Sequence, residues 1–312
     1  MPAPAVRTPL PHLSDCIYLD YNGKHGGAGG VVAGNACAFG CHGHKGRARQ
    51  ASAQVCHGAT APRTAGTTPI FPEVSAAMQP FLTQHFGNPS SGHAYGRACK
   101  AALEAARKQV AAMVNATPSE IFFTSCGTES DAWAIWGACA SARRRRGPGH
   151  VPHVVASAVE HPAVLQTLAA LQAHGLLTYT LVAVDAEGCV AAADVAAAVT
   201  PDTALVTLMH ANNEVGSLQP VAEAAAAARR AGATGMLVHS DAAQSLGKVA
   251  VDVRALGVDM LTVVGHKLGA PKGVAALFVK QGVDPEPLLC GGETPPLPLL
   301  LLSSHNRRCL RR

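Results

Sequence analysis

The chain has 312 residues, of which 48% are hydrophobic and only 14% charged, so it has enough apolar surface to bury a sizeable core. Aromatic residues make up only 4%, which predicts a core of Val, Leu, Ile and Ala and favours an α/β fold. The formal net charge of +5 is not accompanied by groove-entering or base-stacking elements, so we predict no nucleic-acid partner. No apolar run reaches the ~18 residues that span a bilayer, so we predict no membrane partner.

Cysteine usage points to the compartment. The chain holds 10 cysteines at irregular spacing and lacks a signal segment, which indicates free thiols in a reducing compartment. Before Ile17 a single Arg occurs, too little basic charge for a transit peptide. We therefore expect a cytoplasmic protein, with an organelle left open.

The first predicted element is a strand and turn in CIYLDYN, residues 16–22, and a Gly- and His-rich tract follows it over residues 23–65. Two interpretations of the tract, a zinc site and a flexible loop, arise from its residues. Its cysteines and histidines are zinc ligands by type, but they form no regular C-x2-C pair, and the Gly, Ala and Arg bias suits disorder. We assign no metal site, and the residues concerned are Cys37, Cys41, His42, His44, Cys56 and His57.

From Thr67 onward, short apolar runs alternate with helical segments. Pro at position 72 and Glu at 73 favour the first turn of a helix over residues 72–85, and GNPSSGHAYG, residues 87–96, is predicted to be a loop. Apolar residues at three- and four-residue spacing predict a helix over residues 97–114. The run Arg143 to Arg146 is interpreted as a solvated loop.

Continuous apolar runs predict the strands of the domain. Such runs are typical of strands covered on both faces, so we expect a doubly wound, mostly parallel sheet. In such sheets the ligand lies beyond the carboxyl ends of the strands. The predicted strands cover residues 121–125, 153–157, 178–184, 204–210, 236–240, 261–264 and 273–279.

The ends of five of these strands carry unusually varied polar residues. Taken singly, each has an ordinary explanation, such as a helix cap, a packed surface histidine or a solvated charge. Together they supply a phosphate cradle, an acid, an imidazole and a lysine, which are the parts of a pyridoxal phosphate (PLP) site. The residues are Thr128, His161, Asn213, Asp241, Gln244, His266 and Lys267.

Each part has a chemical reason. The turn SCGTES opens a helix, so its backbone N–H groups can hold a phosphate, with the Thr128 hydroxyl as an extra donor. An acid such as Asp241 can keep a pyridine nitrogen protonated and the ring electron-poor. A lysine directly after an apolar strand, as Lys267 is, is desolvated, has a lowered pKa and can form a Schiff base with an aldehyde.

At these residues the sequence resembles the cysteine desulfurase and selenocysteine lyase family, PLP enzymes of the class V aminotransferase group with the fold-type I architecture. The resemblance covers most of the chain, and its motifs occur in family order. They are YLDYN with TTP, GNPSSGHAYGR, IFFTSCGTESD, EHPAV, MHANNEVGSLQPV, HSDAAQSLGK and VDMLTVVGHKLGAPKGVAALFV.

The resemblance implies a role for each residue at the ring. Lys267 is the lysine that forms the Schiff base with PLP, and Asp241 pairs with the pyridine nitrogen. Gln244 hydrogen-bonds the phenolic oxygen. His161 stacks on the ring and takes part in proton transfer, which makes it the second catalytic residue beside Lys267.

The resemblance likewise implies the remaining cofactor contacts. Asn213 lies by the ring and substrate, while Gly127, Thr128 and His266 hold the phosphate. Val264 stands where many desulfurases have a phosphate-binding serine, so one contact of the family is missing or replaced.

The implied reaction removes sulfur or selenium from L-cysteine or L-selenocysteine and gives L-alanine. The resemblance also implies a homodimer and a sulfur or selenium acceptor protein. After Cys290 no residue matches the family's substrate-binding arginine, interface threonine or nucleophilic cysteine, so the small C-terminal domain is largely missing. Cys290 and Cys309 are interpreted as incidental thiols, and Cys126 as a packing residue. A catalytically impaired PLP-binding fragment or heterodimerising subunit is the alternative.

The family pattern also divides the chain. Residues 1–22 belong to the PLP domain, residues 23–65 are a disordered or non-family insertion, residues 66–290 form the PLP-binding large domain, and residues 291–312 are a non-family tail. Removing the insertion joins Asn22 to GTTP and restores the family pattern. We favour translated non-coding sequence as the origin of both atypical segments, which the transcript sequence would test.

Overall fold

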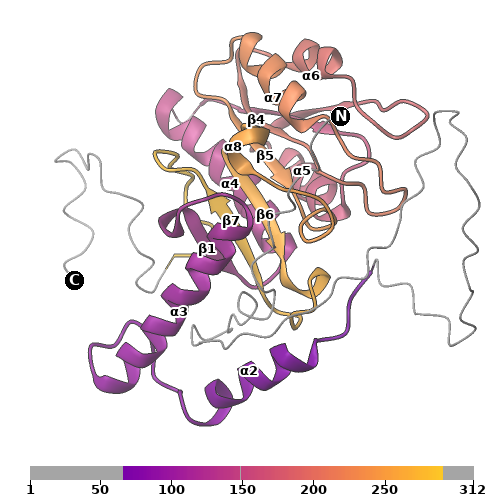
Figure 1. The fold of residues 1–312 in the computed structure, drawn as a ribbon. Helices are drawn as coiled ribbons and strands as arrows, with labels where there is room; N and C mark the ends of the chain where they lie inside the picture. Colours follow the sequence, from indigo (N-terminus) through magenta and orange to yellow (C-terminus); the bar gives the residue numbers. More distant parts are fainter. Residues whose placement is uncertain (1–65, 148, 291–312) are drawn as a thin grey trace, which may run out of the picture.

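The computed structural model describes residues 66–147 and 149–290 (Figure 1). The predicted segment 1–22, the insertion 23–65 with its candidate zinc ligands, and the tail 291–312 with Cys309 lie outside the described residues. Among the helices that are described, none is both long and apolar enough to cross a membrane.

Helices and strands alternate along the described chain, as the sequence predicts. The helices are α2 (Pro72–Thr83), α3 (Ala94–Met113), α4 (Gly127–Arg146), α5 (Pro162–Ala173), α6 (Ala192–Ala198), α7 (Val221–Arg230) and α8 (Val253–Leu256), with short 3-10 turns η1 (Pro118–Glu120) and η2 (Gly265–Lys267). The strands are β1 (Ile121–Thr124), β2 (His153–Ser157), β3 (Thr178–Val182), β4 (Thr203–Thr207), β5 (Leu237–Asp241), β6 (Met260–Val264) and β7 (Ala275–Val279).

The strands form one seven-stranded sheet in the order β1-β7-β6-β5-β4-β2-β3. From β6 through β5, β4 and β2 to β3, neighbouring strands pair in parallel, whereas β7 is antiparallel to both of its neighbours, β1 and β6. All strands except β7 therefore run in the same direction and bring their carboxyl ends to one edge of the sheet. The predicted α/β fold with a mostly parallel sheet is confirmed.

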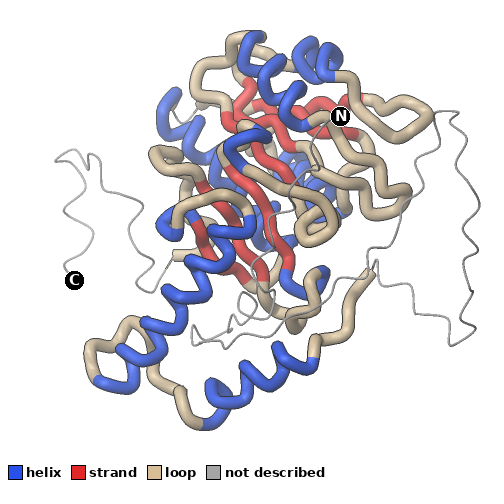
Figure 2. The backbone as a smooth tube through the Cα atoms, in the orientation of Figure 1, coloured by secondary structure: helices blue, strands red, loops and turns tan. Residues whose placement is uncertain are grey.

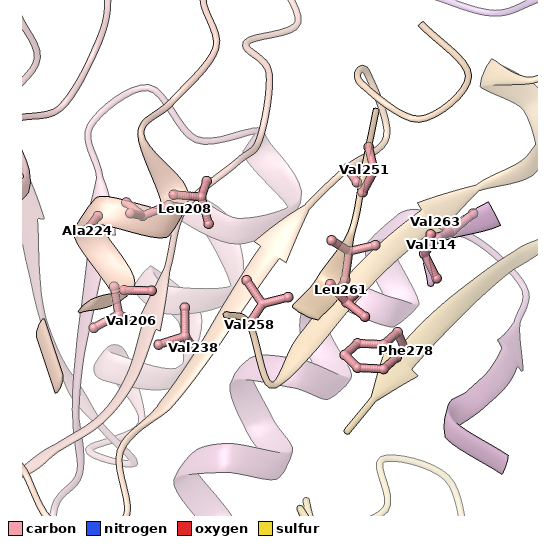
Figure 3. Packing of buried hydrophobic residues seen from close by; sticks show 14 of the residues in the cluster. Val114, Val206, Leu208, Ala224, Val238, Val251, Val258, Leu261, Val263 and Phe278 are labelled. Carbon is pink, nitrogen blue, oxygen red and sulfur yellow. The ribbon is translucent and has the colours of Figure 1, made fainter. Parts of the chain in front are cut away.

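Helices cover both faces of the sheet (Figure 2). Successive side chains of a strand point to opposite faces, so neighbouring residues of one strand join different cores. Leu261 packs with residues from α3, α6, α7 and α8, while Met260 packs with residues from α4 and α5 on the other face. The register pairs Leu261 with Phe278 across β6 and β7, and both lie together in the first of these cores (Figure 3).

Helix α3 begins earlier than predicted, inside the segment expected to be a loop. It starts at Ala94, because the side chain of His93 caps its first turn: the His93 Nδ1 accepts a hydrogen bond from the Gly96 N–H at 3.3 Å. With α2, the start of α3 lies away from the sheet at one end of the molecule (Figure 1).

The arginine run is solvated, as the sequence predicts, but it is helical rather than a loop. Arg143–Arg146 forms the last turn of α4, where cations are favoured by the carbonyl end of the helix. Arg144 pairs with Asp284 at 2.7 Å, and Arg146 pairs with Asp202 at 2.9 Å. Arg144 to Arg146 are exposed, so the run is a solvated end of a helix whose charges pair with two neighbouring segments.

Candidate active site

The polar residues predicted for the site follow β1, β2, β4, β5 and β6, whose carboxyl ends share one edge of the sheet. The chain therefore gathers them at this edge from segments far apart in sequence. These residues are Gly127 and Thr128 after β1, His161 after β2, Asn213 after β4, Asp241 and Gln244 at the end of β5, and His266 and Lys267 after β6.

Lys267 is the last residue of the short turn η2, which directly follows β6. Burial lowers the pKa of its amine, and the opposing attraction of the Asp241 carboxylate does not cancel this effect. The Lys267 Nζ donates a hydrogen bond to the Gly66 carbonyl at 2.8 Å. A lowered pKa increases the fraction of neutral amine, which is the form that attacks a carbonyl carbon.

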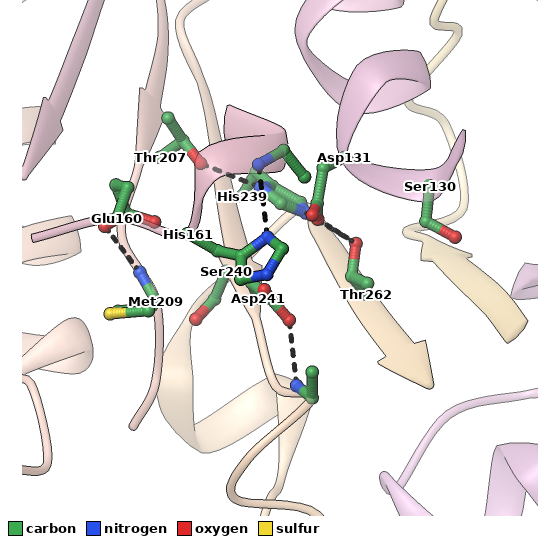
Figure 4. A network of polar contacts seen from close by, with 12 residues as sticks. Ser130, Asp131, Glu160, His161, Thr207, Met209, His239, Ser240, Asp241 and Thr262 are labelled. Carbon is green, nitrogen blue, oxygen red and sulfur yellow. Dashed lines mark hydrogen bonds and ion pairs between the residues drawn. The ribbon is translucent and has the colours of Figure 1, made fainter. Parts of the chain in front are cut away.

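Asp241 ends β5 and is only 7% exposed. Its Oδ1 accepts a hydrogen bond from the Ala243 N–H at 2.8 Å (Figure 4). Burial raises the pKa of the Asp241 carboxyl, against the lowering effects of this hydrogen bond and of the His161 and Lys267 charges. Burial of these two groups therefore disfavours both an isolated Asp241 carboxylate and an isolated Lys267 ammonium group.

His161 is the N-cap of α5, a helix that begins at Pro162. The His161 Nδ1 accepts a hydrogen bond from the Ala163 N–H at 3.1 Å, so in the neutral ring the proton lies on Nε2. The ring is exposed and lies beside Asp241 in Figure 4. The hydrogen bond with Ala163 fixes the orientation of the His161 ring. A planar ligand bound next to Asp241 would therefore contact an imidazole that is already oriented.

The turn before α4 has the backbone of an anion site. Helix α4 is 20 residues long, begins at Gly127, and leaves Thr128 exposed in its first turn. A Cβ added at Gly127 would lie 2.7 Å from the Cγ2 of Val264, so this position is restricted to glycine. Val264 therefore lies directly against the turn. It stands where the resemblance implies a serine, and its side chain has no hydroxyl to donate a hydrogen bond to a phosphate.

The remaining predicted residues lie on loops at the same edge. Asn213 is half-buried in the loop after β4, next to the buried Asn212, whose Oδ1 accepts hydrogen bonds from the Glu214 and Val215 N–H groups. Asn212 therefore shapes the loop on which Asn213 is presented.

His266 belongs to η2, and burial together with the nearby Lys267 and Lys272 charges lowers its pKa. Its backbone carbonyl accepts hydrogen bonds from the N–H and Oγ1 of Thr68, at 3.0 and 2.8 Å. The Thr68 Oγ1 also accepts a hydrogen bond from the Gly269 N–H at 2.9 Å. The TTP motif is thereby joined to the loop that carries Lys267, a role that sequence reasoning did not identify.

A buried polar network beneath the edge was also missed by sequence reasoning (Figure 4). The Thr262 hydroxyl donates a hydrogen bond to Asp131 at 2.8 Å. Because its single proton is used there, the Thr262 oxygen accepts a hydrogen bond from the His239 Nε2 at 3.0 Å. The His239 Nδ1 then accepts a hydrogen bond from the Thr207 hydroxyl at 2.8 Å. Burial lowers the pKa of His239 to about 3. Burial and the Asp241 charge raise the pKa of Asp131 well above its usual range. Three neighbouring strands and helix α4, which carries Asp131, supply these groups, so local sequence patterns carry little signal for them.

Comparisons with known proteins agree with this arrangement. Residues 63–298 match the family described as aminotransferase class-V. A cysteine desulfurase of Trichormus azollae is 43% identical over 226 residues, which cover 72% of this chain and 54% of that protein. The cysteine desulfurase IscS of Methanosarcina thermophila is 42% identical over the same shares. The chain thus spans about half the length of these curated relatives.

Solved structures show the same similarity. A NifS-like protein has a TM-score of 0.69 at 35% identity and is matched over 74% of this chain and 61% of its own. A structure described as SspA in complex with cysteine has a TM-score of 0.68 at 34% identity, over 74% of this chain and 64% of its own. On its family match and its identity to these relatives, the chain belongs to the aminotransferase class-V family, among the relatives of the cysteine desulfurases.

Proposed function

We propose that this chain is the PLP-binding part of an enzyme that takes sulfur from L-cysteine, or selenium from L-selenocysteine, and releases L-alanine. The observation that carries the proposal is that Lys267 and Asp241 lie at one edge of the sheet, close enough for each charge to act on the pKa of the other, with burial lowering the pKa of the amine and raising that of the carboxyl. Cysteine desulfurases related at 42–43% identity support the choice of cysteine.

The residues at the edge fit PLP, the cofactor on which class V aminotransferases and cysteine desulfurases depend. A protonated pyridine nitrogen would supply the positive charge that the buried Asp241 carboxylate needs. The glycine-restricted turn at Gly127, with Thr128 and His266, would hold the phosphate. Val264 would leave one phosphate oxygen without the hydroxyl donor that many desulfurases provide.

The chain's own groups would then act on the substrate in distinct ways. Bound PLP supplies an electron sink for the carbon atoms of the amino acid. Lys267 would hold the cofactor covalently and, once released, move a proton at its Nζ. His161, fixed at Nδ1 by its hydrogen bond with Ala163, would stack on the ring and exchange a proton at Nε2. Asn213 and Gln244 would contact the ring from the neighbouring loops.

The finer assignments are also proposals. We propose a homodimer in the cytoplasm that delivers sulfur or selenium to an acceptor protein, on the strength of the family resemblance. A structure described as SspA in complex with cysteine, at 34% identity, supports cysteine as a ligand of this fold. A non-catalytic PLP-binding or heterodimerising subunit is the second candidate.

The proposal is tested with the recombinant chain incubated with PLP. We expect a visible absorbance of lysine-bound cofactor that Lys267→Ala abolishes, because Lys267 is the lysine assigned to the covalent link. Lys108→Ala, which removes an exposed lysine of α3, is the matched control and should keep the absorbance. Equal absorbance in the wild type and Lys267→Ala would show that the site is assigned wrongly.

Activity separates the two candidate functions. Alanine released from L-cysteine or L-selenocysteine by the PLP-loaded chain, and absent with Lys267→Ala, supports the enzyme. Cofactor absorbance without alanine from either substrate supports the non-catalytic subunit instead. The ratio of the two alanine yields decides between sulfur and selenium.

A further inference from the structure

A lysine that the family resemblance does not assign lies beside the predicted ring-binding residues. In the turn that follows β5, the Lys248 Nζ donates a hydrogen bond to the Oε1 of Gln244 at 3.1 Å. An ammonium group has three donors and no acceptor, so the side-chain atom it binds must be the amide oxygen. This contact therefore distinguishes the two ends of the Gln244 amide, which are otherwise nearly equal in size and shape.

The backbone holds this turn against the loop of Lys267. Gly247 has φ 79°, a conformation that favours glycine, and a Cβ added there would lie 2.8 Å from the Cδ2 of Leu268. Backbone hydrogen bonds from the Lys248 and Val249 N–H groups to the Ser245 carbonyl, at 3.0 and 2.9 Å, close the turn. Because Leu268 directly follows Lys267, the turn cannot move away from the site without losing this packing.

Electrostatics give the same placement for the Lys248 amine. Desolvation of the amine and the Lys267 charge lower the pKa of Lys248. Its ammonium group is thus close enough to the site to respond to the charge there. Lys248 is exposed, so its place beside the site rests on the Gln244 contact rather than on burial.

We propose that Lys248 is a positioning residue, which holds the Gln244 amide oxygen so that the amide NH2 group is the end that meets the phenolic oxygen of PLP. The inference rests on the proposed function, since it concerns the same cofactor. With the amide turned the other way, two oxygen atoms would face each other and the phenolate would lose a donor. A hydrogen bond to the phenolate stabilises its charge and eases loss of the imine proton on Lys267.

The test measures the pH midpoint of the absorbance change of the bound cofactor in a double-mutant cycle. The proteins are the PLP-loaded wild type, Lys248→Met, Gln244→Met and the double variant. We expect each single substitution to raise the midpoint by about 0.5 to 1 pH unit, the size of one lost hydrogen bond. The double variant should shift no further than Gln244→Met, because Lys248 acts through Gln244.

Other results overturn the inference in distinguishable ways. Additive shifts would mean that Lys248 acts on the cofactor by its charge alone, and an unchanged midpoint in Lys248→Met would mean that the contact does not orient the amide. Absence of cofactor absorbance in the wild type would overturn the proposed function together with the inference. Lys108→Met, at an exposed position of α3, controls for general loss of a positive charge and should leave the midpoint unchanged.

Discussion

Glu160, the residue before His161, is a buried carboxyl that joins two strand ends. Its Oε1 accepts hydrogen bonds from the Ser157 hydroxyl at 2.6 Å and from the Met209 N–H at 2.8 Å. Its Oε2 is buried without a hydrogen-bond partner in the described chain. Burial raises the pKa of Glu160 to about 8, despite these hydrogen bonds. The Glu160 side chain is therefore a neutral acid in the folded protein below about pH 8. Its hydrogen bonds fix the start of the segment that carries His161.

This carboxyl makes stability depend on pH. Its pKa rises from 4.5 in the unfolded chain to about 8 in the fold, so its contribution is fully present below pH 4.5 and is lost as the pH rises towards 8. We expect Glu160→Gln to remove that loss. Relative to wild type, the unfolding free energy of the variant should rise by up to about 1.4 kcal/mol per pH unit across this window.

Urea unfolding at several values between pH 5 and pH 8 measures this difference. The exposed Glu223 of α7 offers the control, because Glu223→Gln should follow the wild-type pH dependence. Parallel curves for wild type and Glu160→Gln would contradict the buried, neutral state of Glu160.

At the scale of elements, the segment before α2 is held to the loop after β6. Besides the two contacts of Thr68 with His266, the Phe71 N–H donates to the Gly269 carbonyl at 2.9 Å. Gly269 has φ 81°, and a Cβ there would lie 2.3 Å from the Phe71 ring. These contacts make the Lys267 loop a shared structure of two segments that are about 200 residues apart along the chain.

Thr68→Val tests the importance of this junction. Valine has the shape of threonine, but its side chain neither donates to the His266 carbonyl nor accepts from the Gly269 N–H, while the backbone N–H bond to His266 is kept. We therefore expect the unfolding free energy to fall by about 1 to 3 kcal/mol. Thr67→Val is the matched control, since the exposed Thr67 hydroxyl bonds only the neighbouring Gly66 carbonyl among the described residues. Chemical denaturation checks both, and equal effects of the two substitutions would refute the specific role of Thr68.

The sequence predicts only some of the residues in this part of the site. Lys267 and Asp241 were identified because each follows an apolar strand, a local pattern with a direct chemical meaning. Thr68 and Lys248 were not, since their roles depend on which segments meet in space. Gln244 and Lys248 are four residues apart in QSLGK. Such spacing brings two side chains together in a helix, but this segment is a turn, so the spacing alone does not predict their contact.

At the scale of the whole molecule, two hydrophobic cores share one sheet. Leu261 of β6 is fully buried in one core and Leu277 of β7 is fully buried in the other. The two strands are neighbours, so loss of packing on either face loosens the same hydrogen-bonded ladder. We therefore treat the described sheet and its helices as one cooperative unit.

Large-to-small substitutions in each core check this cooperativity. Leu261→Ala and Leu277→Ala should each lower the unfolding free energy by about 2 to 5 kcal/mol, because each leaves a cavity. Both should shift a single transition when followed by circular dichroism and Trp fluorescence. Leu82→Ala, at a position 61% exposed, is the control with little effect. Two separate transitions in either core variant would contradict a single cooperative unit.

The sequence by itself determined the local parts of this protein: apolar strands, the helices between them, and polar residues with a possible binding or catalytic role at the ends of five strands. Those features depend on periodicity and on neighbours along the chain, so they can be identified without coordinates. The tertiary structure alone decided that β7 inserts antiparallel between β1 and β6. It also decided that Thr68 binds the Lys267 loop and that His239 is linked to Asp131 through Thr262. These arrangements bring together residues distant in sequence, and their free energy comes from packing and burial that no local pattern encodes.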